Sequence, residues 1–308
     1  MLSIVVPVFN EERNISILYY ELKSVLSKLN TNYEIIFVDD GSNDHSFNEL
    51  NILKSKDKNV KIIKFRRNFG QTAALDAGFK SSKGDIIITM DGDLQNDPRD
   101  IPKLIEKIKS GYDVVSGWRY NRNDSFGKKI NSKIANKLRR LLFNDAIHDS
   151  GCTLKAYSKE SIKDLELYGE MHRYITTIIK LKGFKITEVQ VNHRKRKYGK
   201  TKYSTKRLLH GFLDMIFLKF WADYSTRPLH FFGLVGIFQY IIAFIIIIEQ
   251  IIKLLMNKSI VIGPLALTAT VLIITGTLSI ILGFLGEILV RTYYKVHDKT
   301  TYNIEKIL

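Results

Sequence analysis

The stretch Asp85-Ile-Ile-Ile-Thr-Met-Asp-Gly-Asp93 joins a short apolar run directly to two carboxylates. A continuous apolar run of this length is typical of a strand buried on both faces of a sheet. Similar segments lie at residues 2–8, 34–38, 60–65 and 113–117. Apolar residues at helical spacing follow the first segment, and a helix is expected near 72–80. This alternation predicts a Rossmann-like α/β domain, with a mostly parallel sheet and helices on both faces.

Polar side chains follow these segments at the point where each expected strand ends. They are Asn10, Asp39, Asp40, Asp91, Asp93 and Arg119. In open α/β sheets the ligand crevice lies outside the carboxyl ends of the strands, so we expect these side chains to share one site. Asn10 is also expected to cap the helix that follows the first strand.

The composition indicates an anionic partner. The formal net charge is +16, from 47 basic and 31 acidic residues. Nucleic acid, phosphorylated substrates or an acidic membrane surface each satisfy that excess. The one cysteine, Cys152, excludes an intrachain disulfide and fits a reducing compartment. The apolar run at 2–8 is too short for a signal peptide.

The composition changes near Arg227, where two long apolar stretches begin. Each exceeds the roughly 20 residues that a helix needs to cross a bilayer, and two in tandem disfavour buried core helices. Basic residues flank the outer ends of the pair, while the link between them carries only Lys253 and Lys258. The positive-inside rule therefore predicts a multi-pass protein of the inner membrane, with both termini and the catalytic domain in the cytoplasm.

The expected organisation has five parts. The parts are a catalytic domain at 1–203, an interfacial region at 204–227, transmembrane helices at 228–253 and 259–290, and a tail at 291–308. The interfacial region is expected to form an amphipathic helix that lies on the membrane surface rather than packing on the domain core.

Asp91 and Asp93 are candidate ligands of Mg²⁺ or Mn²⁺, because hard divalent cations take oxygen ligands and share them with substrate phosphates. Gln95 and Asp97 offer further oxygens nearby. By itself the Asp-Gly-Asp motif also makes good turns. The run Asp39-Asp-Gly-Ser42 likewise makes a capped turn, but beside residues 7–12 it can form the floor for a base and a ribose.

The order of these motifs resembles glycosyltransferase family 2, and within it the polyprenyl-phosphate glycosyltransferases. The motifs are Pro7-Val-Phe-Asn-Glu-Glu12, Val38-Asp-Asp-Gly-Ser42, Arg67-Asn-Phe-Gly70, Met90-Asp-Gly-Asp-Leu-Gln95, Ser116-Gly-Trp-Arg119, His148-Asp-Ser-Gly-Cys152 and residues 193–203. The resemblance covers essentially the whole chain and implies a GT-A fold, with two C-terminal membrane spans. In the last motif Lys195 stands where the family usually has proline, and Thr201 where it usually has serine.

The resemblance implies a role for each matching residue. The catalytic group would be Asp91, Asp93, Arg119 and Asp149, with Asp149 orienting the acceptor or a basic residue. The nucleotide would contact Pro7, Asn10, Glu11, Asp39, Asp40, Asn68 and Asp91. Asp93 and Gln95 would bind the metal. Donor and acceptor phosphates would meet Arg119, Arg122, Lys128, His193, Arg194, Arg196, Lys202 and Tyr203.

The predicted reaction is an inverting, metal-dependent transfer of a hexose from a nucleotide diphosphate sugar to undecaprenyl phosphate. UDP-glucose is the first expectation for the donor. The acceptor phosphate has a second pKa of about 6, so it is mostly dianionic and needs little help from a base. His148, His172 and His193 are therefore expected to be structural or to contact phosphate.

Two alternatives stay open. A processive polysaccharide synthase usually carries a Gln-x-x-Arg-Trp motif and more spans, and this chain has no such motif. A basic, membrane-tethered binding module fits the charge, but the acidic strand ends would repel nucleic acid, so no nucleic-acid partner is expected. Self-association is left open, and Gly276, Gly283 and Gly286 permit close packing of helices.

Overall fold

The computed structural model describes residues 1–120, 136–143, 147–165, 167, 169–198, 206–256 and 263–296, with side chains omitted at 206–212 and 294–296. The chain divides into two compact units, Met1–Met215 and Ile216–Leu308. Each unit is described by itself.

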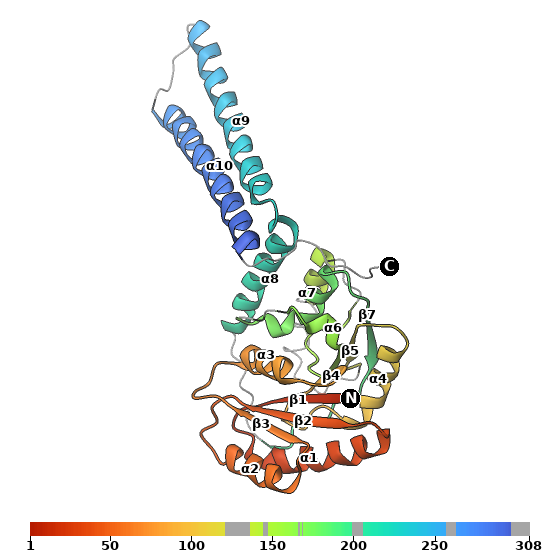
Figure 1. Cartoon of the computed structure of the whole chain (residues 1–308). Coiled ribbons are helices and arrows are strands. Elements are labelled where there is room, and N and C mark those ends of the chain that lie inside the picture. The colour runs from red at the N-terminus through yellow and green to blue at the C-terminus, as the bar shows by residue number, and fades with distance from the viewer. Residues whose placement is uncertain are drawn as a thin grey trace. The chain divides into compact units, whose positions relative to one another are not determined.

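The first unit is built on a seven-stranded sheet in the order β3-β2-β1-β4-β6-β5-β7 (Figure 1). The strands are β1 (Leu2–Val8), β2 (Tyr33–Asp39), β3 (Val60–Lys64), β4 (Ile86–Thr89), β5 (Val114–Trp118), β6 (Lys155–Ser158) and β7 (Ile186–Gln190). Apart from β6 the strands are parallel. The five strands expected from the sequence are confirmed to within two residues, because continuous burial on both faces gives them continuous apolar runs.

Strand β6 is antiparallel to both of its neighbours, β4 and β5. This strand is not among those expected from the sequence, because its Lys155-Ala-Tyr-Ser158 is too short and too polar to stand out. Since β6 runs in the opposite direction, its beginning lies at the edge where the parallel strands end. The segment just before β6 therefore joins the predicted site.

Helices cover both faces of the sheet, as predicted. One face packs against α1 (Glu12–Leu26), α2 (Ser46–Lys56) and α4 (Ile101–Lys109) through a core that includes Leu18, Leu50 and Leu104. The other packs against α3 (Gln71–Ser81), α6 (Lys159–Ile162) and α7 (Ile175–Leu181). Short 3-10 helices also occur, η1 at Ser27–Leu29, η2 at Pro98–Asp100 and η3 at Met171–Arg173.

The expected role of Asn10 as a helix cap is wrong. Glu11 holds the N-cap position of α1, and the amide of Glu12 donates to Asp44 Oδ2 at 3.3 Å. Asn10 has a left-handed backbone (φ 54°) and its Oδ1 accepts a hydrogen bond from the amide of Asn43 at 2.8 Å. Asn10 instead ties the loop after β1 to the loop after β2, since its amide also donates to Ser42 Oγ at 3.0 Å.

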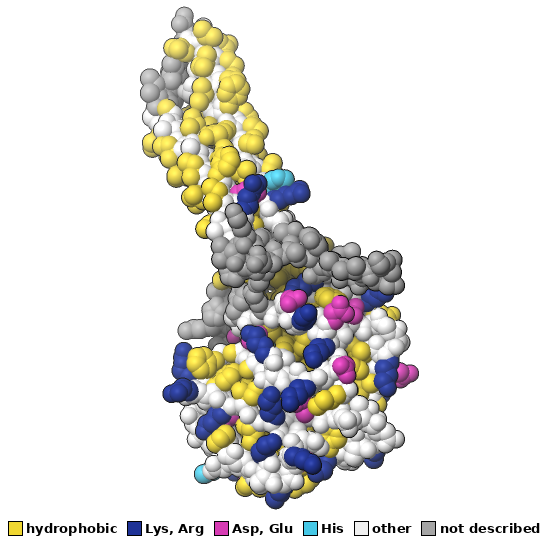
Figure 2. Space-filling model, viewed as in Figure 1, with side chains coloured by type: hydrophobic (Ala, Val, Ile, Leu, Met, Phe, Trp, Pro, Cys, Tyr) yellow, Lys and Arg dark blue, Asp and Glu magenta, His cyan; other side chains and the backbone are white. Residues whose placement is uncertain are grey.

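The second unit contains the end of α8 (Lys206–Tyr224) and the long helices α9 (Pro228–Leu255) and α10 (Pro264–Val296). Both long helices have the length and apolar composition to cross a membrane. Only 11% of the most apolar window of each is buried, so neither is a core helix of a soluble domain. Figure 2 shows the hairpin covered by hydrophobic side chains.

The two long helices pack closely through glycine. A Cβ atom added to Gly236 would lie 2.7 Å from the carbonyl oxygen of Gly276. The hydroxyls of Tyr240 and Thr277 also share a hydrogen bond of 2.8 Å. Gly276, noted in the sequence for close packing, thus packs within the hairpin.

Candidate active site

The Asp91–Gln95 turn follows β4 and occupies the middle of the carboxyl edge. Asp91 Oδ1 accepts a hydrogen bond from Gln71 Nε2 at 2.7 Å, and Asp93 Oδ1 accepts one from the amide of Gln95 at 3.1 Å. Leu94, between Asp93 and Gln95, has φ 63°, an uncommon conformation for a bulky residue, and it is buried. Burial of Leu94 therefore helps to hold the turn that carries the two carboxylates.

The two carboxylates of this turn repel one another. Desolvation by burial, and then the charge of Asp93, raise the pKa of Asp91 to about 6, although Thr153, Arg119 and Arg196 act in the opposite direction. Asp93 is buried and pairs with the guanidinium of Arg196 at 2.5 Å. The turn thus concentrates the negative charge of two carboxylates, and the guanidinium of Arg196 already offsets part of it.

The donor set fits a hard divalent cation that also binds substrate oxygens. Two carboxylates lie on one short turn, and the amide oxygen of Gln95 follows. In the described part of the chain no cluster of three or more His, Cys, Asp or Glu side chains is suited to a metal. Mg²⁺ is often held by one or two carboxylates with phosphate oxygens and water completing its shell, so a larger protein cage is not required.

The acidic residues after β2 are held by amide groups. Asp39 is fully buried, and its Oδ1 accepts from the amide of Ser42 at 2.9 Å, while Oδ2 has no hydrogen-bond partner among the described residues. Asp40 accepts from Asn68 Nδ2 and from the amides of Phe69 and Gly70, at 2.7 to 3.0 Å. Burial nevertheless raises the pKa of Asp40, and neighbouring Asp39 adds to the rise. Asp40 and Asn68 therefore position a loop together.

Gly41 makes this loop contact possible. It has φ +71°, and a Cβ atom there would lie 2.4 Å from the carbonyl carbon of Arg67. Only glycine allows that left-handed backbone and that close approach together. The predicted nucleotide residues Pro7, Asn10 and Glu11 lie at the end of β1 or just after it, with Glu11 donating its amide to Ser46 Oγ at 2.8 Å.

Arg119 and Asp149 form a buried, two-pronged ion pair at the end of β5. Arg119 Nε lies 2.7 Å from Asp149 Oδ2, and the second prong spans 2.9 Å to Oδ1. The amide of Arg119 also donates to Asp149 Oδ2 at 3.3 Å. Both carboxylate oxygens of Asp149 are thus engaged by Arg119, an arrangement that orients the guanidinium rather than leaving a carboxylate to act as a base.

The segment after β7 brings two more arginines to acidic partners. Arg194 contacts Asp97 at 2.6 Å and Glu21 of α1 at 2.7 Å, while Arg196 pairs with Asp93. His193 is buried and forms a β-bridge with Asn96.

The carboxylate of Asp97 is not open to a metal ion. Burial opposes its ionisation, but hydrogen bonds from Arg99 and Asn192 and the charge of Arg194 hold its pKa well below the usual range. All of these groups surround its carboxylate at 2.6 to 3.2 Å. Asp97 therefore anchors the segment after β7 to the turn after β4.

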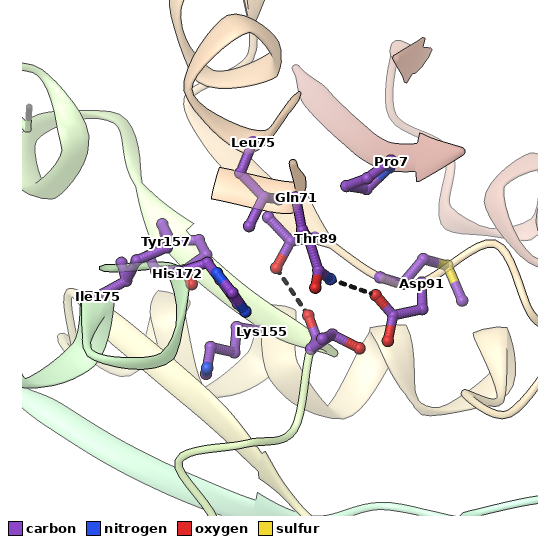
Figure 3. Close-up of a pocket in the computed structure, with 11 residues that line it drawn as sticks. Pro7, Gln71, Leu75, Thr89, Asp91, Lys155, Tyr157, His172 and Ile175 are labelled. Atoms are coloured by element: carbon purple, nitrogen blue, oxygen red, sulfur yellow. Dashed lines mark hydrogen bonds between the residues drawn. The ribbon is translucent and has the colours of Figure 1, made fainter. Parts of the chain in front are cut away.

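A pocket beside Asp91 contains three residues that were not singled out from the sequence. Gln71, Thr153 and Lys155 line it together with Asp91, Pro7 and His172 (Figure 3). Thr153 Oγ1 donates to Asn96 Oδ1 at 3.0 Å, and that oxygen also accepts the amide of Asp91. Lys155 carries no sequence signal of its own, because the missed strand β6 is what brings it to this edge.

Some predicted residues lie outside the described part of the chain. They are Arg122, Lys128, Lys202 and Tyr203. Their assignment to donor or acceptor phosphates stays a prediction.

Relatives with known activities match almost the whole chain. Dodecaprenyl-phosphate galacturonate synthase of Rhizobium johnstonii is 36% identical over 99% of this chain and 92% of its own length. Undecaprenyl-phosphate 4-deoxy-4-formamido-L-arabinose transferase of Pseudomonas fluorescens is 35% identical over 99% of this chain and 90% of its own.

The fold is also similar to solved structures. Glucosyl-3-phosphoglycerate synthase of Mycobacterium tuberculosis, in complex with Mn²⁺ and UDP-glucose, superposes with a TM-score of 0.56 at 17% identity, over 73% of this chain and 81% of that one. The model of the family described as "Glycosyl transferase family 2" matches residues 3–166. The chain therefore belongs to glycosyltransferase family 2, and within it to the polyprenyl-phosphate glycosyltransferases.

Proposed function

We propose that this protein transfers a sugar from a nucleotide diphosphate sugar to undecaprenyl phosphate, with a divalent cation and inversion at the anomeric carbon. The observation that carries the proposal is the Asp91–Asp93 turn, which lies between amide-held acidic loops on one side and arginines on the other. A phosphate oxygen of the acceptor attacks the anomeric carbon as the bond to the diphosphate breaks. The products are a glycosyl polyprenyl phosphate and a nucleoside diphosphate.

The nucleotide is assigned to the ends of β1 and β2. Asp39 supports this assignment, because its buried Oδ2, which no described residue contacts by a hydrogen bond, can accept an N–H from a base. Pro7 and Asn10 lie beside it on β1 and its loop. Asp40 and Asn68 are assigned an indirect role, because their hydrogen bond holds the loop at this end of the site.

Asp93 and Gln95, with Asp91 beside them, are assigned to Mg²⁺ or Mn²⁺. When bound, such an ion stabilises the charge that develops on the departing diphosphate. Arg196 would leave Asp93 for a phosphate oxygen as the cation binds, since both compete for the same carboxylate. Related folds have been solved with Mn²⁺ and UDP, which agrees with this assignment.

Arg119 is assigned to a phosphate, with Asp149 as the group that orients it. Arginine's planar fork matches phosphate oxygens, and the two parallel hydrogen bonds to Asp149 fix the orientation of this guanidinium. His193 and Arg194 position the loop that carries Arg196, so their expected phosphate contact becomes an indirect role in this proposal. No catalytic base is assigned, because the acceptor is a dianion near neutral pH.

The protein is assigned to the inner membrane, with α9 and α10 as its spans and the catalytic unit in the cytoplasm. Basic residues outside the hairpin support that orientation. The apolar side chains Leu213, Ile216, Phe217 and Trp221 of α8 are exposed, which supports an interfacial helix.

The sugar is the least constrained part. Glucose from UDP-glucose is the expectation from the sequence, whereas the relatives named above transfer galacturonate and a formamido-arabinose. The donor set for testing therefore includes neutral, acidic and amino sugars.

The direct test incubates membranes that contain the protein with radiolabelled nucleotide sugars and undecaprenyl phosphate. Label should enter the lipid fraction with Mg²⁺ or Mn²⁺ and should not do so after chelation by EDTA. Transfer that EDTA leaves unchanged would contradict the metal assignment. Absence of label from the lipid fraction with every donor would overturn the proposed function.

A further inference from the structure

The loop that carries Asp149 decides how well Arg119 is aimed. In the proposed function Asp149 orients Arg119 toward a phosphate through two parallel hydrogen bonds. A carboxylate can fix a guanidinium only as firmly as its own loop is fixed, and a misplacement of about 1 Å can cost about 10²-fold in rate. We call residues 148–150 the Asp149 loop. The residues that hold this loop therefore bear on the reaction.

Lys155 holds one flank of the Asp149 loop. Its Nζ donates to the carbonyl oxygen of Ser150 at 2.8 Å, and Figure 3 shows its side chain directed away from Asp91. The side chain is buried, and desolvation lowers its pKa to about 8, although Cys152 and Asp149 act to raise it. A methionine of similar length would avoid that desolvation, so packing alone does not account for a lysine here.

Glu188 holds the other flank of the loop. Its Oε2 accepts a hydrogen bond from the amide of His148 at 2.8 Å, and its Oε1 pairs with His148 Nδ1. The imidazole of His148 also stacks on Trp118, with 4.5 Å between the ring centroids and 18° between the planes. The main chain and the side chain of His148 are thus both fixed, directly before Asp149 in the sequence.

The two contacts come from one row of the sheet. Ser116 of β5 lies opposite Lys155 of β6 and also opposite Glu188 of β7. Cross-strand partners share a face, so Lys155 and Glu188 lie on the same face of the sheet, on either side of β5. Arg119 follows directly after β5. The strand that presents the arginine is therefore flanked by the two side chains that hold the loop of its carboxylate partner.

We propose that Lys155 and Glu188 are positioning residues of the transfer reaction, which hold the Asp149 loop in place. Asp149 can then aim Arg119 at a phosphate. Neither positioning side chain touches substrate in this role. The inference rests on the proposed function, which assigns Arg119 to a phosphate of the donor or of the acceptor. Kinetic constants measured for each substrate separate these two sources.

Glu188→Ala and Lys155→Met test the proposal in membranes that contain the full chain, with undecaprenyl phosphate and a nucleotide sugar that the unaltered protein transfers. Each variant should lower kcat/KM on the order of 10-fold, less than disruption of the arginine fork itself. Glu188→Gln should keep most of the activity, since its amide oxygen can still accept the amide of His148. Gln190→Ala on β7 and Lys159→Met on α6 are the matched controls. Both residues are exposed, and their replacement should leave transfer unchanged.

A double-variant cycle with Arg119→Lys separates positioning from a purely structural role. If both residues act through the arginine, Glu188→Ala or Lys155→Met should cost less than about twofold once Arg119 is replaced. Arg119→Lys will change kcat, the KM of the donor or the KM of the acceptor, and each single variant should change the same constant. A further loss of about 10-fold in the Arg119→Lys background would overturn the inference, because independent effects multiply.

Amide hydrogen exchange gives a second measurement that does not depend on transfer. Exchange in residues 148–152 should become faster in Glu188→Ala and in Lys155→Met, and should stay unchanged in the controls. Unchanged exchange in both variants would overturn the inference, as would normal transfer by both. If Lys155→Met does not fold, Glu188→Ala carries the test by itself, because Glu188 lies on the edge strand β7.

The failure of this inference can be told from a failure of the proposed function. Multiplying losses in the double variants leave the function standing and remove the inference. Failure of the unaltered protein to label the lipid with every donor removes both.

Discussion

The two halves of the catalytic edge satisfy their acidic residues in different ways. At the ends of β1 and β2, Asp39 and Asp40 accept hydrogen bonds from main-chain amides and from one asparagine. Around the ends of β4, β5 and β7, three acidic residues pair with arginines, while Asp91 accepts a hydrogen bond from the side-chain amide of Gln71. These pairs are Asp93 with Arg196, Asp97 with Arg194 and Arg99, and Asp149 with Arg119.

The difference matches what each half is proposed to bind. A carboxylate that accepts hydrogen bonds from amide groups can hold a loop throughout a reaction. The amides carry no net charge, so a substrate anion does not draw them away. An arginine that pairs with a carboxylate can exchange that partner for a substrate phosphate, because both are anions. In the proposed function, one half would form the floor for a nucleotide, and the other would supply arginines to phosphates.

Asp93→Ala should have the largest effect. It removes a proposed metal ligand and the partner of Arg196, and the loss of stabilisation by a metal amounts to several kcal/mol, or roughly 10³-fold in transfer rate. The rate of labelling of polyprenyl phosphate measures it. Asp85→Ala is the control, because its side chain is 80% exposed and pairs with the N-terminus. Near-normal transfer by Asp93→Ala would contradict the metal assignment.

Arg119→Lys should have the next largest effect. Lysine retains the charge but cannot make two parallel hydrogen bonds to Asp149, so we expect kcat/KM to fall about 10²-fold with little change in thermal stability. Asp149→Asn should reproduce much of this loss, since it also disrupts the fork. If Asp149→Asn is active and only Arg119→Lys is impaired, then Asp149 does not orient the arginine.

Asp40→Asn tests the other half, where stability should change more than chemistry. The new amide group cannot accept all three hydrogen bonds from Asn68, Phe69 and Gly70, which should cost about 2 kcal/mol of folding free energy. Thermal unfolding in detergent measures the loss, with Asp85→Asn for comparison. A variant of unchanged stability would show that this loop does not depend on Asp40.

Asp91→Asn should stabilise the protein without substrate, by about 1–2 kcal/mol at neutral pH. The folded state raises the pKa of Asp91 to about 6 from its ordinary 3.8, so it binds the proton more tightly than the unfolded chain does. The stability from this proton is present below pH 4 and is lost as the pH rises through about 6. Melting temperatures at pH 4 and pH 7 test this, because the gain should vanish at the lower pH.

The sequence by itself determined five of the seven strands, the two long apolar helices and the acidic residues at the strand ends. These features are local: a strand buried on both faces needs an apolar run, and a helix that can cross a membrane needs a long one. The order of motifs was also enough for the family, because each motif is contiguous.

Only the tertiary structure decided which charges meet. Arg196 reaches Asp93 across 103 residues of sequence, and Asp149 meets Arg119 across 30. Strand β6 enters between β4 and β5 against the direction of both, and this places Lys155 in a pocket beside Asp91. Strand order and the burial of a charge depend on contacts between distant segments, so no local pattern of residues specifies them.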